Sequence, residues 1–369
     1  MRKLAIIGAS YLQLPLVKKA AEMGLETHCF AWEAGAVCKE FVNYFYPISI
    51  MDKENILEKC RQISIDGIVS IASDAAVPTV SYVAETLGLV SNDFSDALAC
   101  TDKYEMRTRF FENKVSCPQF LLFTDDITEV DFKFPVIVKP VDRSGSRGVS
   151  KVYYNADLPT AIKRAKDESF ARKVIVEEYI TGSEVSVETI SWQGTHYILA
   201  ITDKETTGEP FFVELAHHQP SQLPNNVLEN IKKETIKSLD ALNIKYGASH
   251  AEFKITENGN VFAIETGARM GGDFIGSDLV RLSSGFDFVK AVIEIALGLF
   301  NPPQKFYNKF SGVYFLSQES KRLLNVFERL SDHLEIKEAK KIDAELRNLR
   351  CSADRSGYFI YQSDTKFII

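Results

Sequence analysis

Residues 249–267 decide the fold of the second half of the chain, and they read SHAEFKITENGNVFAIETG. Two runs of alternating apolar and polar residues flank Asn258 and Gly259. Asn-Gly between such runs predicts a β-hairpin, because a type I′ turn requires positive φ at both central residues. With these two residues at the centre of the turn, the strands pair so that Glu252 faces Glu265.

The facing glutamates predict a metal site. Their Cβ atoms would lie about 5 Å apart and the like charges would repel. We expect Phe253, Phe262 and Ile264 to point to the other face, so that a divalent cation offsets the repulsion. Oxygen ligands with room for water and phosphates suit Mg²⁺, for which Mn²⁺ could substitute. An exposed hairpin with solvated glutamates explains the pattern equally well when it is taken alone. Arg269 and Gly271 follow directly and favour the metal site, since a fixed guanidinium there suits a phosphoryl or carboxylate group.

A second segment, residues 136–149, reads VIVKPVDRSGSRGV. An apolar strand ends at Lys139, and a Gly/Ser loop follows it. Such a loop can place a positive charge and free backbone N–H groups around a polyphosphate. A flexible hairpin is the alternative, because the P-loop pattern G-x-x-x-x-G-K-[ST] is absent from the sequence. The loop residues with this predicted role are Ser144, Gly145, Ser146 and Gly148.

A third segment, residues 174–188, reads VIVEEYITGSEVSVE. Its extended backbone can bind the edge of an adenine, and Glu184, beyond a flexible joint at Gly182, can accept hydrogen bonds from two ribose hydroxyls. An acidic surface strand is the alternative interpretation.

The first 98 residues alternate short apolar runs with amphipathic stretches. We expect strands at 4–8, 26–32 and 67–72 and helices at 13–23, 53–62 and 76–87. This alternation predicts a parallel, doubly wound, Rossmann-like sheet. No G-x-G-x-x-G begins at Gly8, so we do not expect NAD to bind there.

The remainder of the chain is richer in strands and is predicted to be α+β. We expect strands at 120–123, 135–141, 149–154, 173–180, 184–192, 196–203, 211–215, 310–316 and 357–361, and helices at 157–168 and 226–242. Trp32 and Trp192 are assigned to the hydrophobic core.

Composition excludes several classes of protein. The net charge of −7 and pI near 5.6 argue against a nucleic-acid-binding surface. No apolar run is long enough to cross a bilayer. The six cysteines show no C-x-x-C or metal-ligand spacing, and we interpret them as buried thiols of a cytoplasmic protein.

Taken in order, these segments resemble the ATP-grasp superfamily, from the first strand to about residue 300. The resemblance implies that ATP binds with one or two Mg²⁺ ions, held by Glu252 and Glu265. It implies catalytic roles for Arg269, Lys139 and Glu265. The nucleotide-binding residues that it implies are Lys103, Lys139, Ser144, Gly145, Ser146, Gly148, Glu177, Glu178, Tyr179, Ile180 and Glu184.

Within the superfamily the chain is most similar to the L-amino-acid ligases, which form dipeptides. Residues 250–254 (HAEFK) and 214–217 (ELAH) carry this similarity. The implied substrate contacts are Asp74, Glu214, His217, Arg269 and Gly271. A satisfied structural histidine is the alternative for His217.

One position departs from the family pattern. Many members have Glu-x-Asn-x-Arg where this chain has Glu265-Thr266-Gly267-Ala268-Arg269. Gly267 cannot supply an amide oxygen, and the number of metal ions is therefore open.

The resemblance implies a ligase that phosphorylates a carboxylate, that of an amino acid, and condenses the acyl phosphate with an amine. A purine-pathway or carboxylase-type enzyme and a non-catalytic ATP-binding sensor are the alternatives. The implied domains are a Rossmann-like domain (1–98), a two-lobed ATP-grasp domain with antiparallel sheets (99–300, small lobe 118–181) and a C-terminal α/β segment (301–369). We expect the last segment to complete the pocket or to form a homodimer contact.

Overall fold

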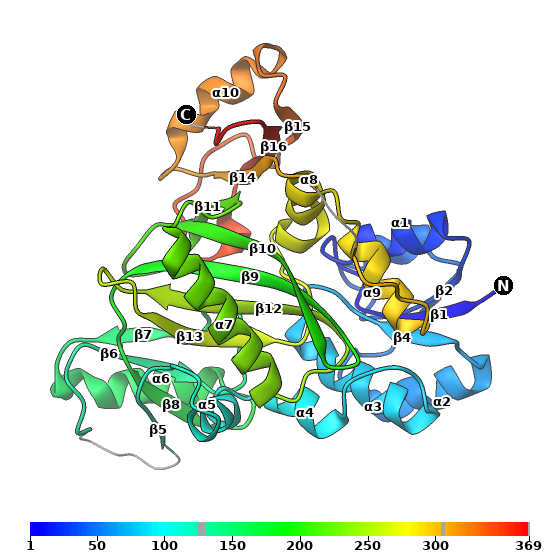
Figure 1. Ribbon diagram of the computed structural model, residues 1–369, viewed down its shortest axis with the longest axis horizontal. Coiled ribbons are helices and arrows are strands. Elements are labelled where there is room, and N and C mark those ends of the chain that lie inside the picture. The colour runs from blue at the N-terminus through cyan, green and yellow to red at the C-terminus, as the bar shows by residue number, and fades with distance from the viewer. Residues whose placement is uncertain (124–129, 304–306, 368–369) are drawn as a thin grey trace.

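The computed structural model describes residues 1–123, 130–303 and 307–367. The described residues form a four-stranded parallel sheet, an eight-stranded antiparallel sheet and a second, antiparallel sheet of four strands (Figure 1). The predicted fold class, a parallel α/β part followed by antiparallel α+β parts, is confirmed.

The N-terminal sheet has the strand order β3-β2-β1-β4, and all its pairs are parallel. Its strands are β1 (Lys3–Ile7), β2 (Glu26–Phe30), β3 (Tyr44–Tyr46) and β4 (Gly67–Val69). The helices of this part are α1 (Leu14–Glu22), α2 (Lys53–Ile63), α3 (Val77–Leu87) and α4 (Phe94–Ala99). The three predicted strands and three predicted helices are present, whereas β3 was missed.

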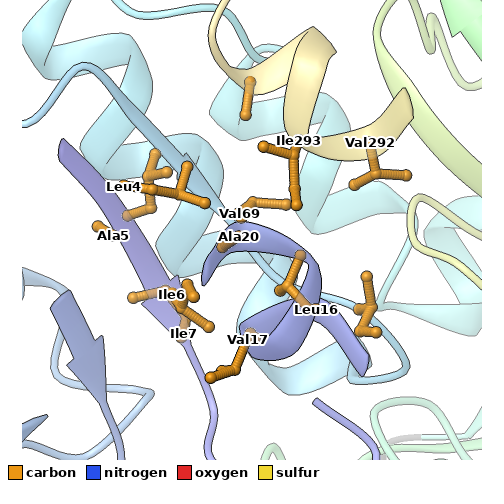
Figure 2. Close-up of a cluster of buried hydrophobic side chains, with 14 of the residues drawn as sticks. Leu4, Ala5, Ile6, Ile7, Leu16, Val17, Ala20, Val69, Val292 and Ile293 are labelled. Carbon is orange, nitrogen blue, oxygen red and sulfur yellow. The ribbon is translucent and has the colours of Figure 1, made fainter. Parts of the chain in front are cut away.

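The core of this sheet also receives a helix from much later in the chain. Side chains of β1 and α1 pack with Val292 and Ile293 of α9 (Phe288–Ala296), as Figure 2 shows. Contact with α9 is so close that a Cβ on Gly67 of β4 would lie 2.6 Å from the carbonyl oxygen of Ala296. The boundaries proposed at residues 98 and 300 stay predictions.

The small sheet has the order β5-β8-β6-β7 and carries the predicted phosphate loop and adenine segment. Its strands are β5 (Phe120–Phe123), β6 (Val136–Pro140), β7 (Ser150–Val152) and β8 (Val174–Glu178). The helix α6 (Leu158–Glu168) packs against it through Leu158, Ile162 and Ala165. Helix α5 (Lys103–Glu112) precedes this sheet in the chain.

The large sheet has the order β13-β12-β9-β10-β11-β14-β16-β15, so the C-terminal strands extend it. Its strands are β9 (Ser183–Trp192), β10 (Thr195–Thr206), β11 (Glu214–Gln219), β12 (Gly247–Ile255), β13 (Val261–Gly267), β14 (Phe310–Leu316), β15 (Ile336–Lys341) and β16 (Gly357–Ser363). Helix α7 (Asn225–Ala241) lies across it (Figure 1), and the remaining α-helices are α8 (Val280–Ser284) and α10 (Leu324–Glu328).

The strand predicted at 211–215 is wrong. Residues 207–213 form a loop closed by hydrogen bonds from Thr207 N to Val213 O (2.8 Å) and from Phe212 N to Gly208 O (2.8 Å). Strand β11 therefore begins only at Glu214.

The β12–β13 hairpin has the predicted pair but not the predicted turn. Gly259 has φ +78° and Asn258 is not left-handed, and Thr256 N donates to Asn260 O at 3.0 Å. The loop is therefore three residues long, with a left-handed glycine at its end. A bulge after Glu252 shifts the register back, so that Glu252 pairs with Glu265 as predicted.

The bulge also changes which side chains share a face. Ile264 has no partner in the register and lines the same cavity as Glu265, so its predicted orientation is wrong. Phe253 lies in the core, as predicted.

Two predictions about burial are wrong as well. Trp32 is 54% exposed, and Cys351, one of six free cysteines, is exposed too. Within the described ranges, no helix has the length and apolar character needed to span a membrane.

Gly182 joins the small sheet to β9 by close packing and not as a loose joint. Its φ is +151°, and a Cβ there would lie 2.0 Å from the carbonyl oxygen of Ile255 in β12. The backbones of the two strands approach too closely for any side chain at this position.

We expect Gly182→Ala to lower the free energy of unfolding by at least about 2 kcal/mol, because it combines backbone strain with overlap against a carbonyl group. The control is Gly194→Ala, which has φ +77° but no atom within 4 Å of the added Cβ. It should cost about 1 kcal/mol from strain alone. Equal losses in urea unfolding would contradict the packing argument.

Candidate functional site

A cavity of about 270 Å³ lies where α5, the small sheet and the large sheet meet, and we call it the central cavity. It brings together most of the residues that the sequence predicted for nucleotide, metal and substrate. Those that line it are Lys103, Lys139, Ser144, Gly145, Ser146, Glu177, Glu178, Tyr179, Ile180, Glu184, Glu214, Glu252 and Glu265.

One wall of the central cavity contains a buried triad of charges. Glu177 contacts Lys139 Nζ at 2.6 Å and Arg107 Nε at 2.8 Å. Burial raises the pKa of Glu177, but Arg107 and Lys139 outweigh burial and hold that pKa below its usual value. Burial lowers the pKa of Lys139, and Glu177 opposes this effect. With all three groups ionised, the triad carries one net positive charge beside the cavity, which suits an anionic ligand.

Arg107 was missed by the sequence analysis, although a signal for it exists. It follows Lys103 by four positions in α5, and residues with this spacing share one helix face. Lys103 Nζ donates to the carbonyl oxygen of Arg143 at 2.8 Å and to Glu265 Oε1 at 3.1 Å. This lysine therefore ties the Gly/Ser loop to the β12–β13 hairpin.

A second missed residue, Lys204, links three of the predicted acidic residues. Its Nζ lies 2.6 Å from Glu184, 2.7 Å from Glu252 and 3.7 Å from Glu214, and its side chain is 4% exposed. Burial lowers the pKa of Lys204, but the three carboxylates raise it well above its usual value. Lys204 follows the apolar run at 198–201 of β10, as Lys139 follows the apolar run at 136–138 of β6, and this pattern was the available signal.

These lysines change the explanation of the facing glutamates. Lys204 pairs with Glu252, and Lys103 pairs with Glu265. These lysines offset the repulsion between the two carboxylates, and the Mg²⁺ site predicted at Glu252 and Glu265 stays a prediction. No cluster of three or more His, Cys, Asp or Glu suited to a metal occurs in the described part of the chain. Two carboxylates facing one cavity remain compatible with Mg²⁺ whose other ligands are water and phosphate oxygens.

His250 contacts the same oxygen of Glu252 as Lys204 does. Its Nε2 lies 3.3 Å from Glu252 Oε1, and its Nδ1 makes a short contact with Glu188. Burial lowers the pKa of His250, but Glu188 and Glu252 together raise it to about 9. His250 is therefore an imidazolium at neutral pH, and it adds a second positive charge beside Glu252.

Arg269 is held by Asp74, which follows β4 of the N-terminal sheet. Two hydrogen bonds join them, Nε to Oδ1 at 2.8 Å and Nη2 to Oδ2 at 2.9 Å. A Cβ on Gly267 would lie 2.9 Å from Asp74 Oδ1. The Asp74 carboxylate thus fills the space that a side chain at position 267 would need.

Five predicted residues do not line the central cavity: the Asp74–Arg269 pair described above, and His217, Gly271 and Gly148. His217 is buried, lies 3.7 Å from Asp273 through its Nε2, and has a pKa lowered by burial. The N–H of Gly271 donates to Glu188 Oε2 at 3.0 Å. Gly148 packs against Pro140 and Glu168.

The neighbouring His218 is structural. Its ring nitrogens contact the Tyr361 hydroxyl at 3.0 Å and Glu205 at 3.1 Å.

We expect Lys204→Met to lower the free energy of unfolding at pH 7 by about 2–3 kcal/mol, because it leaves three partly buried carboxylates without their shared cation. In the wild type, Lys204 and His250 together outweigh burial and hold the pKa of Glu252 well below its unfolded-state value of 4.5, so this stabilisation is present above that value and is lost as the pH falls. In the variant only His250 opposes burial, so the same pKa is higher than in the wild type. The difference between the two proteins should therefore shrink between pH 7 and pH 5 in urea unfolding.

The control is Lys163→Met, which removes a lysine that is 78% exposed and pairs with Asp167 on the surface of α6. It should cost less than about 0.5 kcal/mol. A Lys204→Met loss that is independent of pH would argue against the charge cluster.

The chain is similar to several known proteins. The ATP-grasp domain family matches residues 132–278. The D-alanine–D-alanine ligase of Rickettsia bellii is 25% identical over 293 residues, which are 75% of this chain and 89% of that enzyme. The carbamoyl phosphate synthase large chain of Caldanaerobacter subterraneus subsp. tengcongensis is 25% identical over 261 residues, which are 69% of this chain and 24% of that protein. The chain thus spans about a quarter of the length of such large chains.

A crystal structure of an L-amino acid ligase from Bacillus licheniformis has the same fold. It superimposes with a TM-score of 0.82 at 23% identity, covering 99% of this chain and 94% of that one. Residues 132–278 thus match the ATP-grasp domain family, and the described chain has the fold of this ligase structure.

Proposed function

We propose that the protein is an ATP-dependent ligase that converts a carboxylate, that of an amino acid, into an acyl phosphate and joins it to an amine. One observation carries the proposal: the lysines, the Gly/Ser loop and the facing glutamates all line one cavity within an ATP-grasp domain. The names of two similar proteins, D-alanine–D-alanine ligase and L-amino acid ligase, support a reaction between amino acids.

In the proposed reaction, the positive side of the central cavity holds the ATP phosphates. Lys139 and Lys103 lie on this side, and the loop at 144–146 offers backbone N–H groups. The backbone of Glu178 to Ile180 would bind adenine, and Glu184 the ribose. Glu252 and Glu265 would hold one or two Mg²⁺ ions, which neutralise charge on the phosphate oxygens.

The chemistry has two displacement steps. An oxygen of the substrate carboxylate attacks the γ-phosphorus, the bond to the β-phosphate oxygen breaks, and ADP leaves. The amine nitrogen then attacks the acyl carbon, and inorganic phosphate leaves as the amide forms. Arg269, fixed by Asp74, would hold the transferring phosphoryl group. In this mechanism the protein accelerates the reaction by positioning the reacting groups and by neutralising the charge on the phosphate oxygens.

We expect Glu265→Gln to lower amino-acid-dependent ADP formation at least about 100-fold, because it removes a charged ligand of the phosphate-bound metal. ADP is measured with a coupled assay over pairwise mixtures of amino acids. The matched control is Glu257→Gln, an exposed carboxylate at the tip of the same hairpin, which should leave the rate unchanged. Persistent ADP formation in purified Glu265→Gln would overturn the proposed site.

The match to carbamoyl phosphate synthase large chains gives a second candidate, a ligase that phosphorylates bicarbonate. ATP hydrolysis that depends on bicarbonate and not on amino acids would support it. ATP binding without ADP formation under either condition would instead indicate a sensor, and both ligase proposals would fail.

A further inference from the structure

A second cavity, of about 540 Å³, lies beside the central cavity, and we call it the side cavity. It is formed by the ends of N-terminal elements, by α4 and by the Gly/Ser loop. The two cavities share Lys103, Arg143, Ser144 and Glu265 as lining residues, so they meet where the proposed γ-phosphate lies. A molecule in the side cavity would thus have one end at the reacting centre.

The wall of the side cavity contains large apolar side chains that are exposed. Trp32 is 54% exposed, Met51 52%, Leu98 42% and Phe170 63%. They come from four separate segments and all line this one hollow. Single exposed apolar residues are ordinary, but their convergence on one concave surface indicates an apolar ligand.

The acidic residues of the side cavity already have partners. Asp74 is paired with Arg269, and Glu265 with Lys103. Asp142 accepts the backbone N–H groups of Phe170 and Ala171, at 3.3 and 2.7 Å. Each of these carboxylates therefore has a partner within the described structure.

Arg143, by contrast, has unused capacity at the junction of the two cavities. Its buried Nε has no hydrogen-bond partner among the described residues. Its guanidinium lies over the Phe170 ring at 4.3 Å, and its ion pair with the half-exposed Glu168 is long, at 3.7 Å. A guanidinium in this state suits a carboxylate, which can accept two of its hydrogen bonds.

We propose that the side cavity binds the acyl substrate, a carboxylate with a bulky aromatic or long alkyl group. The carboxylate contacts Arg143 beside Lys103, and the apolar group packs against Trp32, Leu98 and Phe170. A volume of about 540 Å³ lies within the range of pockets that enclose whole small molecules, and it exceeds what a two-carbon carboxylate would fill. The inference rests on the proposed ligase function and specifies its substrate class.

Tryptophan fluorescence tests the proposal without turnover. The chain has two tryptophans: Trp32 in the side cavity and Trp192, which packs against Tyr246 and Phe300. We expect 3-phenylpropionate to change the emission of the full chain and of Trp192→Phe, but not that of Trp32→Phe. Acetate should have no effect at the same concentration. A response to 3-phenylpropionate that survives in Trp32→Phe would overturn the assignment.

Arg143→Met tests whether the carboxylate of the ligand contacts Arg143. It should weaken binding of 3-phenylpropionate at least about 10-fold, the loss of a charged hydrogen-bonded pair, and should leave binding of the neutral 3-phenylpropanol nearly unchanged. If 2-phenylethylamine binds more tightly than 3-phenylpropionate, and Arg143→Met does not weaken either, the side cavity holds the amine and the proposal is wrong.

A larger side chain that fills the side cavity distinguishes a failure of this proposal from a failure of the ligase proposal. Leu98→Trp should abolish binding of 3-phenylpropionate, whereas Leu299→Trp, at a residue 45% exposed that does not line the side cavity, should not. Binding that follows this pattern without any ADP formation would support the side cavity and refute the ligase. ADP formation with acetate and 3-phenylpropionate at equal rates, unaffected by Leu98→Trp, would support the ligase and refute the side cavity.

Discussion

The site depends on one constraint, that carboxylates removed from water must have cations beside them. Adjacent strands β9, β10, β11 and β12 place Glu184, Lys204, Glu214 and Glu252 on one face of the large sheet. The register pairs Lys204 directly with Glu184, and β12 brings Lys254 opposite the same glutamate. Without the lysine in the central strand, three acidic groups would face one another in a closed space. Lys204 therefore stabilises the pairing of these strands as well as the charge balance of the central cavity.

The N-terminal sheet contributes to the site by the same principle. Asp74 leaves the carboxyl end of β4, where open parallel sheets bind their ligands, and reaches Arg269 beyond the end of β13. The absence of a side chain at Gly267 makes room for that contact. The glycine that leaves the number of metal ions open also serves packing, because it admits a carboxylate that follows a strand of another sheet. The two halves of the chain are thus joined by an ion pair next to the proposed reacting groups.

Local sequence patterns predicted most of the helices and strands that they were used for. The site residues that were not predicted depend on contacts between segments far apart in the sequence. Periodicity located the parallel strands and most antiparallel ones, but β3 has only three residues and β15 is mostly charged. The pairing of Glu252 with Glu265 was predicted correctly, although the predicted turn was wrong. The three-residue loop shifts the strand register by one residue, and the bulge shifts it back. Lys204 and Arg107 were missed because their partners lie on other elements. Trp32 was assigned to the core from the average behaviour of tryptophan, which cannot distinguish a ligand-facing position from a buried one.

The placement of α9 affects how the chain can acquire its structure. Helix α9 packs against the strands of the first 70 residues, yet it follows five of the eight strands of the large sheet in the chain. On a ribosome, the N-terminal sheet would emerge with this apolar face uncovered, and it would stay so until roughly 200 further residues had been made. A fragment that stops before α9 would expose the side chains that α9 covers, and would tend to aggregate. The core of the N-terminal sheet is therefore complete only once α9 has been synthesised.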